Sequence, residues 1–273
     1  MTAGRLRSRE LVKPFRGMRI ERSSDSTESR LRAFALHRGV DFAFSHTTAA
    51  ELYGVPLPAH RRGELHVSVP GSCRAPIVNG FVGHKLHRWA TVDLRGFPVT
   101  SPEQTWLDLA IDLPHSDLVI AGDHVVGGRD PLTNVAALRE AISASAGRRG
   151  IGRARAALAR VRIGSESPGE TRLRLLLEDA GLPLPLLNLD VHDRSGAFVA
   201  RVDLAYAAER IALEYEGDIH RTDQATWRKD IARRERVEDL GWRVVRVTAD
   251  DIAAPLPLAA RIRHLLRTRQ SLY

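Results

Sequence analysis

The sequence predicts an α/β protein of the α+β class. Its C-terminal part has the order αβββαβ around a central mixed sheet, and a smaller α+β domain with linker helices precedes it. Two observations support this class. Three short strand-like runs lie between two helical stretches in the last hundred residues. The 273-residue chain is also long for one compact domain and ordinary for two.

The C-terminal elements are defined by their boundary residues. Ser167 and Glu170 occupy the N-cap and N3 positions of a helix that ends at Gly181. The segments that follow have either strand alternation or a helical apolar face. In chain order they are strands 187–191, 199–206 and 210–216, a helix 223–240, a strand 242–247 and a final helix 250–269 delayed by two prolines.

The N-terminal half has weaker signals, and residues 1–30 are predicted to be peripheral. The best-defined helix starts at Ser101, with Pro102 at the first helical position. The other expected elements are helices near 28–36, 131–145 and 152–161, a strand end and capped helix at 43–52, a strand at 65–70 and short strands within 77–99.

A basic connector separates the two parts. It contains six arginines and no acidic residue between Gly147 and Ile163: Arg148, Arg149, Arg153, Arg155, Arg160 and Arg162. These arginines either contact phosphate groups or form the solvated face of a linker helix. The predicted domains are therefore 1–145 and 165–273, joined by a basic linker at 146–164.

Composition indicates which class of binding partner and which cellular compartment to expect. A net charge of +8 and a pI of about 10.4 favour a polyanion such as DNA, although a GC-rich genome also produces arginine-rich proteins. No run approaches the roughly 20 apolar residues of a membrane span, so no membrane partner is expected. Cys73 is the single cysteine, which excludes an intrachain disulfide and favours a cytoplasmic location.

Strand periodicity indicates a carboxylate site. In the run 211–216 alternate side chains face opposite ways, so Glu214 and Glu216 share one face, roughly 7 Å apart at the backbone. Hairpin pairing with the preceding strand would bring Asp203 beside Glu214. Oxygen ligands of this kind suit Mg²⁺ or Mn²⁺. The alternative is a solvent-exposed sheet face, with Asp203 paired to an arginine such as Arg201.

Two further residues are candidates for the same site. His220 lies four residues after Glu216, where a loop could return its imidazole as acid, base or phosphate donor. Glu170 either completes the capping box of its helix or contributes an outer carboxylate, and the sequence supports both roles equally.

Several short motifs in the C-terminal part, in this order and spacing, resemble a known family. They are Ser167-Pro168-Gly169-Glu170, Arg201-Val202-Asp203-Leu204, Glu214-Tyr215-Glu216-Gly217, His220-Arg221, Asp230, Arg233-Arg234 and Leu240-Gly241-Trp242-Arg243-Val244-Val245-Arg246. Over about residues 165–250 the chain resembles a bacterial domain-of-unknown-function family related to the very-short-patch-repair (Vsr) endonucleases. These belong to the PD-(D/E)xK superfamily, whose fold is restriction-endonuclease-like.

The resemblance implies a magnesium-dependent endonuclease acting in DNA repair, phage defence or a toxin–antitoxin pair. Asp203 and Glu214 would correspond to the metal-binding acids. Glu216 stands where many members carry the lysine that polarises the attacking water, so Glu216, His220 or a second metal would have to replace it. The expected DNA-binding residues are Arg221, Arg233 and Arg234. A catalytically inactive DNA-binding regulator or antitoxin on the same scaffold is the alternative.

The N-terminal half resembles the AbiEi-type antitoxin region. The motifs are Phe44-Ser45-His46-Thr47-Thr48-Ala49-Ala50-Glu51-Leu52-Tyr53-Gly54, Val99-Thr100-Ser101-Pro102 and Trp106-Leu107-Asp108-Leu109-Ala110. The usual N-terminal winged helix is shortened or absent. Six histidines in this half lack a pair at helical ligand spacing with a carboxylate partner, so we expect them to be scattered: His37, His46, His60, His66, His84 and His87.

Overall fold

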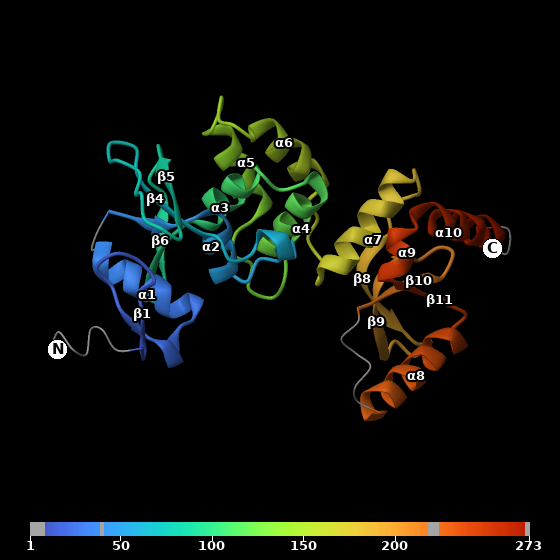
Figure 1. Cartoon of the computed structure of the whole chain (residues 1–273). Coiled ribbons are helices and arrows are strands. Elements are labelled where there is room, and N and C mark those ends of the chain that lie inside the picture. The colour runs from blue at the N-terminus through green and yellow to red at the C-terminus, as the bar shows by residue number, and fades with distance from the viewer. Residues whose placement is uncertain (1–8, 39–40, 218–223, 271–273) are drawn as a thin grey trace. The chain divides into compact units, whose positions relative to one another are not determined.

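The computed structural model describes residues 9–38, 41–217 and 224–270, and for 224–229 it describes the backbone alone. It divides the chain into two compact units (Figure 1). The first unit comprises Met1–Val125 and Leu132–Arg160, and the second comprises Val126–Pro131 and Val161–Tyr273. The first unit is the longer one, although the sequence analysis expected the smaller domain there. In the described ranges no helix has the length and apolar character of a membrane span.

The first unit contains a five-stranded mixed sheet in the order β5-β4-β3-β7-β6. The β4–β5 and β3–β7 pairs are parallel, and the other pairs are antiparallel. The strands are β3 (Ala43–Phe44), β4 (Leu65–Pro70), β5 (Phe81–Leu86), β6 (Thr91–Leu94) and β7 (Phe97–Thr100). A short β1–β2 pair (Leu11–Val12, Ile20–Glu21) and α1 (Thr27–Arg38) precede the sheet, and Phe34 of α1 stacks on Phe81 with ring centroids 4.3 Å apart.

Five helices complete the first unit: α2 (His46–Leu52), α3 (Pro102–Leu109), α4 (His115–Val126), α5 (Val135–Ser143) and α6 (Ile151–Arg160). Helix α4 was not expected from the sequence. Its residues Leu118–Ala121 are all buried, so it lacks the polar stripe that reveals a surface helix. Helix α6 lies in the first unit rather than in a separate linker, because Ala154 and Ala157 are buried there.

The second unit is an α+β fold around a four-stranded mixed sheet, as the sequence predicts. The strand order is β11-β10-β9-β8, with β10 and β11 parallel and the other pairs antiparallel. Its elements, in chain order, are α7 (Pro168–Asp179), β8 (Leu186–His192), β9 (Phe198–Tyr206), β10 (Ile211–Glu216), α8 (Gln224–Asp239), β11 (Arg243–Thr248), α9 (Ala249–Ala253) and α10 (Pro255–Gln270).

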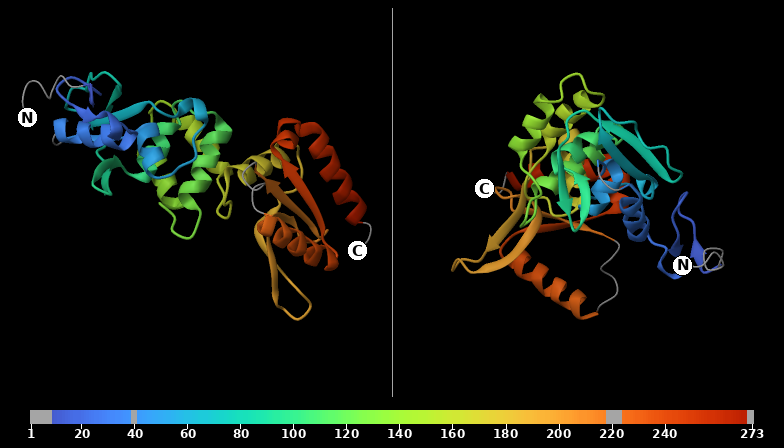
Figure 2. Two further views of the ribbon diagram at one scale, coloured as in Figure 1. Left: turned by 60° about the horizontal axis from the view of Figure 1, so that its bottom comes forward. Right: turned by 90° about the vertical axis from the view of Figure 1, so that its left-hand side faces the viewer.

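Helices cover both faces of this sheet (Figure 2). On one face Leu204 and Leu213 pack with Leu173 of α7 and Ile262 of α10. On the other face the cluster includes Val237 of α8. The β8–β9 hairpin contributes to both: Leu187 packs against the first cluster and Leu189 against the second. Leu187 and Leu189 would share one face in a regular strand. They pack on opposite faces because the backbone of Asn188 between them is left-handed, with φ 46°, which interrupts the alternation.

Gly169 sets how closely α7 approaches the sheet. A methyl group at this position would overlap the ring of Tyr215 on β10. We expect Gly169→Ala to destabilise the second unit by about 1–3 kcal/mol through overpacking. The measurement is hydrogen exchange of α7 and β10 amides in the full-length protein.

The control is Gly152→Ala in α6, where an added methyl meets no atom within 4 Å. It should leave α7 exchange unchanged and stabilise α6 by at most about 1 kcal/mol, the helix-propensity difference between glycine and alanine. Unchanged α7 exchange in Gly169→Ala would contradict the packing argument.

Candidate functional site

Asp203 lies at the point where β9 and β10 separate. The backbone pairing of the two strands ends at Leu204 opposite Leu213. If this register is continued by one residue, Asp203 lies opposite Glu214. Here the Asp203 carboxylate, instead of a backbone carbonyl, accepts a hydrogen bond from the Tyr215 amide at 2.8 Å. The side chain is therefore held at the fork between the two strands.

The surroundings of Asp203 disfavour its charged form. Burial raises the pKa of Asp203 to about 6, and the carboxylates of Glu170 and Glu214 push it in the same direction. The Tyr215 amide and the Arg233 guanidinium oppose the shift. Three acidic side chains from α7, β9 and β10 therefore interact at one place, and a cation would relieve their repulsion.

Glu214 is buried and has a positively charged partner. Its side chain forms an ion pair with Arg233 of α8 at 2.9 Å. The same guanidinium donates to the carbonyl of Arg201 at 3.0 Å. Arg233 thus fastens α8 to β9 and β10 while neutralising Glu214.

Glu216 is engaged with two arginines on the rim of the sheet. Arg246 of β11 forms hydrogen bonds and an ion pair with it, and Arg234 of α8 lies 3.7 Å away. Within the ranges that the structure describes, Asp203, Glu214 and Glu216 do not place three oxygens within 4.8 Å of one another. The same is true of Asp203, Glu214 and Glu170 in the described residues, although the charges of Glu170 and Glu214 act on Asp203, and Glu216 is paired to arginine.

Glu170 does not complete the expected capping box, because its carboxylate bonds the amide of Glu166, one residue before the N-cap, and not that of Ser167. Ser167 accepts from the Glu170 amide at 3.2 Å, and Glu170 accepts from the Glu166 amide at 2.8 Å. Only 7% of Glu170 is exposed, and it contributes to the raised pKa of Asp203. The start of α7 thus holds the Glu170 carboxylate where its charge acts on Asp203, and its part in the site stays a prediction.

The remaining predicted site residues divide into two groups. His220 and Arg221 lie outside the described residues. Arg233 and Arg234 face glutamates of the sheet, so their predicted role toward DNA would add to an internal one. The alternative partner for Asp203 is engaged elsewhere: Arg201 pairs with Asp190 at 2.7 Å.

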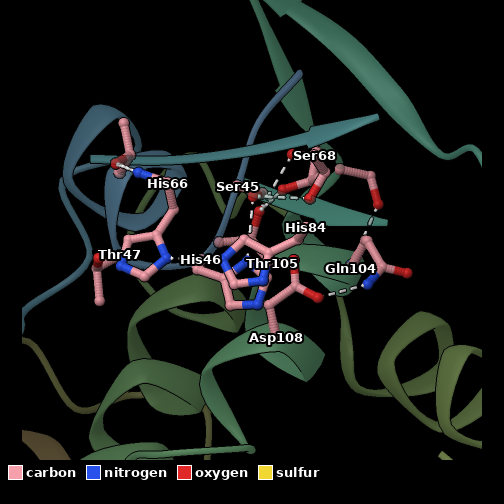
Figure 3. Close-up of polar contacts among 12 residues, drawn as sticks. Ser45, His46, Thr47, His66, Ser68, His84, Gln104, Thr105 and Asp108 are labelled. Carbon is pink, nitrogen blue, oxygen red and sulfur yellow. Dashed lines mark hydrogen bonds and ion pairs between the residues drawn. The ribbon is translucent and has the colours of Figure 1, made fainter. Parts of the chain in front are cut away.

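The expectation that the N-terminal histidines are scattered is wrong for three of them. One ring nitrogen each from His46, His66 and His84 lies within 4.8 Å of the others. Figure 3 shows the three rings beside Asp108. His66 and His84 come from the parallel strands β4 and β5, and His46 is the first residue of α2. Helical spacing could not reveal this cluster, because strand pairing assembles it from segments far apart in sequence.

The histidine rings are stacked and mostly buried. The His46 and His84 centroids are 3.7 Å apart, and Nδ1 of His66 lies 2.9 Å from Nε2 of His84. Burial, followed by repulsion from neighbouring imidazoles, lowers the pKa of His46 to about 3 and that of His84 to about 4. Burial also lowers the pKa of His66. The three rings are therefore neutral at pH 7.

Two mycobacterial proteins are similar to most of the chain. They are the uncharacterized proteins MT2308 and Rv2248 of two Mycobacterium tuberculosis strains, each 32% identical over 248 residues, which cover 89% of this chain and 88% of theirs. The chain belongs to their family. No family model matches it. The crystal structure of the RV2827C protein from M. tuberculosis covers 67% of this chain and 73% of its own, with a TM-score of 0.38 and 19% identity, too low to define a shared fold.

The raised pKa of Asp203 predicts a pH-dependent gain in stability on Asp203→Asn. The native state holds its proton up to about pH 6, whereas the unfolded state releases it near 3.8, so wild-type stability falls as pH rises between these values. Asparagine removes that penalty, and the variant should gain up to about 3 kcal/mol at pH 8 and little at pH 4. The measurement is the opening free energy of β10 amides by hydrogen exchange without divalent cations.

Asp190→Asn on the neighbouring strand is the matched control. Its hydrogen bond from Arg201 lowers the pKa of Asp190, so neutralising it should give no gain as pH rises. Equal pH profiles for the two variants would show that Asp203 carries no such penalty.

Proposed function

We propose that the second unit hydrolyses phosphodiester bonds of DNA with Mg²⁺ or Mn²⁺. The observation that carries the proposal is Asp203, held at the strand fork with a pKa raised to about 6 beside two other carboxylates. A buried acid whose pKa is strongly raised by desolvation and by neighbouring charges is a candidate functional group. The residues involved also match the acids that the nuclease resemblance assigns.

The donor set fits a hard divalent cation. Asp203 and Glu214 would hold it through carboxylate oxygens from adjacent strands, and Glu170 adds a third negative charge nearby. Glu214 is paired with Arg233 in this structure. To bind the cation, Glu214 would have to free one carboxylate oxygen from the guanidinium, or Arg233 would have to turn toward a phosphate. When bound, such a cation stabilises charge on the scissile phosphate and lowers the pKa of its water.

The protein's own groups would orient the nucleic acid and move the proton. Arg233 and Arg234 lie on α8, near the end of β10, and both can hold phosphate oxygens. Glu216 occupies the position of the lysine found in many related nucleases, but Arg246 and Arg234 engage it. His220, which lies outside the described residues, would then take the proton from water, or a second metal would activate the water.

One observation favours a second function, that of a non-catalytic DNA-binding regulator. The ion pairs Arg233–Glu214 and Arg246–Glu216 give both glutamates an arginine partner. A protein that only binds DNA would have no need to open them. The two functions differ in metal-dependent turnover.

Glu214→Gln separates enzyme from binder. For an enzyme, loss of one metal-ligand charge should lower the cleavage rate by about 100-fold or more, since metal-held charge stabilisation is worth several kcal/mol. DNA binding should persist, because a negative charge facing phosphate has been removed. The measurement is cleavage of plasmid, nicked and mismatched DNA with Mg²⁺ or Mn²⁺, alongside binding at low and high salt.

The control is Glu238→Gln, which removes the same charge from an exposed position on α8. It should cut like the wild type. Equal cutting by Glu214→Gln would place the activity at another site or in a contaminant. Intact binding with no cutting by the wild type on any substrate would support the regulator.

A further inference from the structure

A second polar cluster lies in the first unit and has no part in the proposed function. We propose that His46, His66 and His84 bind one divalent transition-metal ion of the Zn²⁺ class, with Asp108 orienting His46. Imidazole nitrogen is a preferred ligand of Zn²⁺, and three protein ligands with a water in the fourth position form a common zinc site.

The separation of the rings fits a shared ion. Nδ1 of His66 and Nε2 of His84 are 2.9 Å apart, so one proton now lies between them. Two nitrogens on a tetrahedral zinc ion, each at about 2.0–2.1 Å, lie about 3.3 Å apart. Replacing the shared proton by an ion therefore requires the two nitrogens to separate by only a few tenths of an ångström, and each ring to turn so that its nitrogen points at the ion.

His46 completes the set from the start of α2. Its ring now lies over that of His84, so binding requires the His46 side chain to turn its edge toward the ion. The backbone of His46 is left-handed, with φ 52°, a strained conformation for histidine that holds the residue at this point of the strand-to-helix turn. All three imidazoles are already neutral, which is the form that binds metal.

Asp108 supplies an independent indication of a ligand. Only 2% of it is exposed, and Oδ1 is engaged by Arg148 and by Gln104 at 2.8 Å. Its buried Oδ2 has no hydrogen-bond partner in the described chain and lies 3.6 Å from Nδ1 of His46, which also contacts Oγ of Ser45 at 3.1 Å. A carboxylate directed at a ligand histidine is the usual outer support of a zinc site, because it fixes the ring and raises its basicity.

The cluster also has room for a fourth ligand. A cavity of about 30 Å³ beside two of the three histidines is lined by His46, His66 and Asp108, together with Glu64, Asp112 and Arg61. This volume holds one water molecule. This cavity leaves a position for water beside the histidines, as in zinc sites with an open coordination position.

The test uses tag-free, full-length protein, so that no added histidine contributes. Co²⁺, which replaces Zn²⁺ and absorbs visible light, should bind at one equivalent with the intense bands of a four-coordinate nitrogen–oxygen site. Zn²⁺ should abolish the spectrum, and excess Mg²⁺ should not. Zn²⁺ affinity is then measured by competition with a chromophoric chelator.

His66→Gln and His84→Gln should each weaken Zn²⁺ binding by more than about 100-fold, and Asp108→Asn, which acts through His46, by about 10–100-fold. The matched control is His87→Gln, an exposed histidine just beyond β5. It should bind like the wild type. Circular dichroism and thermal unfolding of the metal-free variants separate loss of a ligand from loss of fold.

Three results would overturn the proposal: no stoichiometric Co²⁺ or Zn²⁺ binding by the wild type, a six-coordinate Co²⁺ spectrum, or undiminished affinity in both His66→Gln and His84→Gln. If one variant fails to fold, the wild-type spectrum and the other variant still decide. Glu214→Gln should retain full Zn²⁺ affinity, so this site and the proposed nuclease site can fail independently.

Discussion

The second unit depends on how far β9 and β10 remain paired. Up to Leu204 and Leu213 the strands exchange backbone hydrogen bonds and bury the core. One residue later the Asp203 side chain takes over as acceptor for the Tyr215 amide. A carboxylate that replaces a backbone acceptor satisfies a buried donor and also places negative charge between two strands. The fold and the candidate site therefore share one interaction.

Arginine serves as internal counter-ion throughout this chain. Arg233, Arg246 and Arg148 each face an acidic side chain that is wholly or partly buried. Arg153 instead donates to the carbonyls of Ala110, Ile111 and Leu113, where α3 ends. Part of the basic composition is thus used to stabilise the fold, and the net charge of +8 overstates the arginine available to a polyanion.

The sequence was sufficient where local patterns coincide with tertiary structure. Alternation along 211–216 and the Ser167–Glu170 cap identified β10 and α7, and hairpin pairing placed Asp203 opposite Glu214. The sequence was not sufficient where a helix is buried on all sides, or where a contact joins residues far apart in the chain. Helix α4 is too deeply buried to show a polar stripe, and the histidine cluster depends on parallel pairing of β4 and β5. The ion pairs of Glu214 and Glu216 likewise depend on where α8 and β11 pack.

The left-handed Asn188 divides the β8–β9 hairpin into two parts that pack on opposite faces of the sheet. Residues before it pack with the α7 core, and those after it pack on the opposite face of the sheet. The hairpin tip is closed by its own bonds, since Asp193 accepts from the amides of Ser195 and Ala197. Length changes at the tip would therefore not shift the strand fork, which makes this turn the natural place for evolutionary insertions, or for a fluorescent label, that leave Asp203 undisturbed.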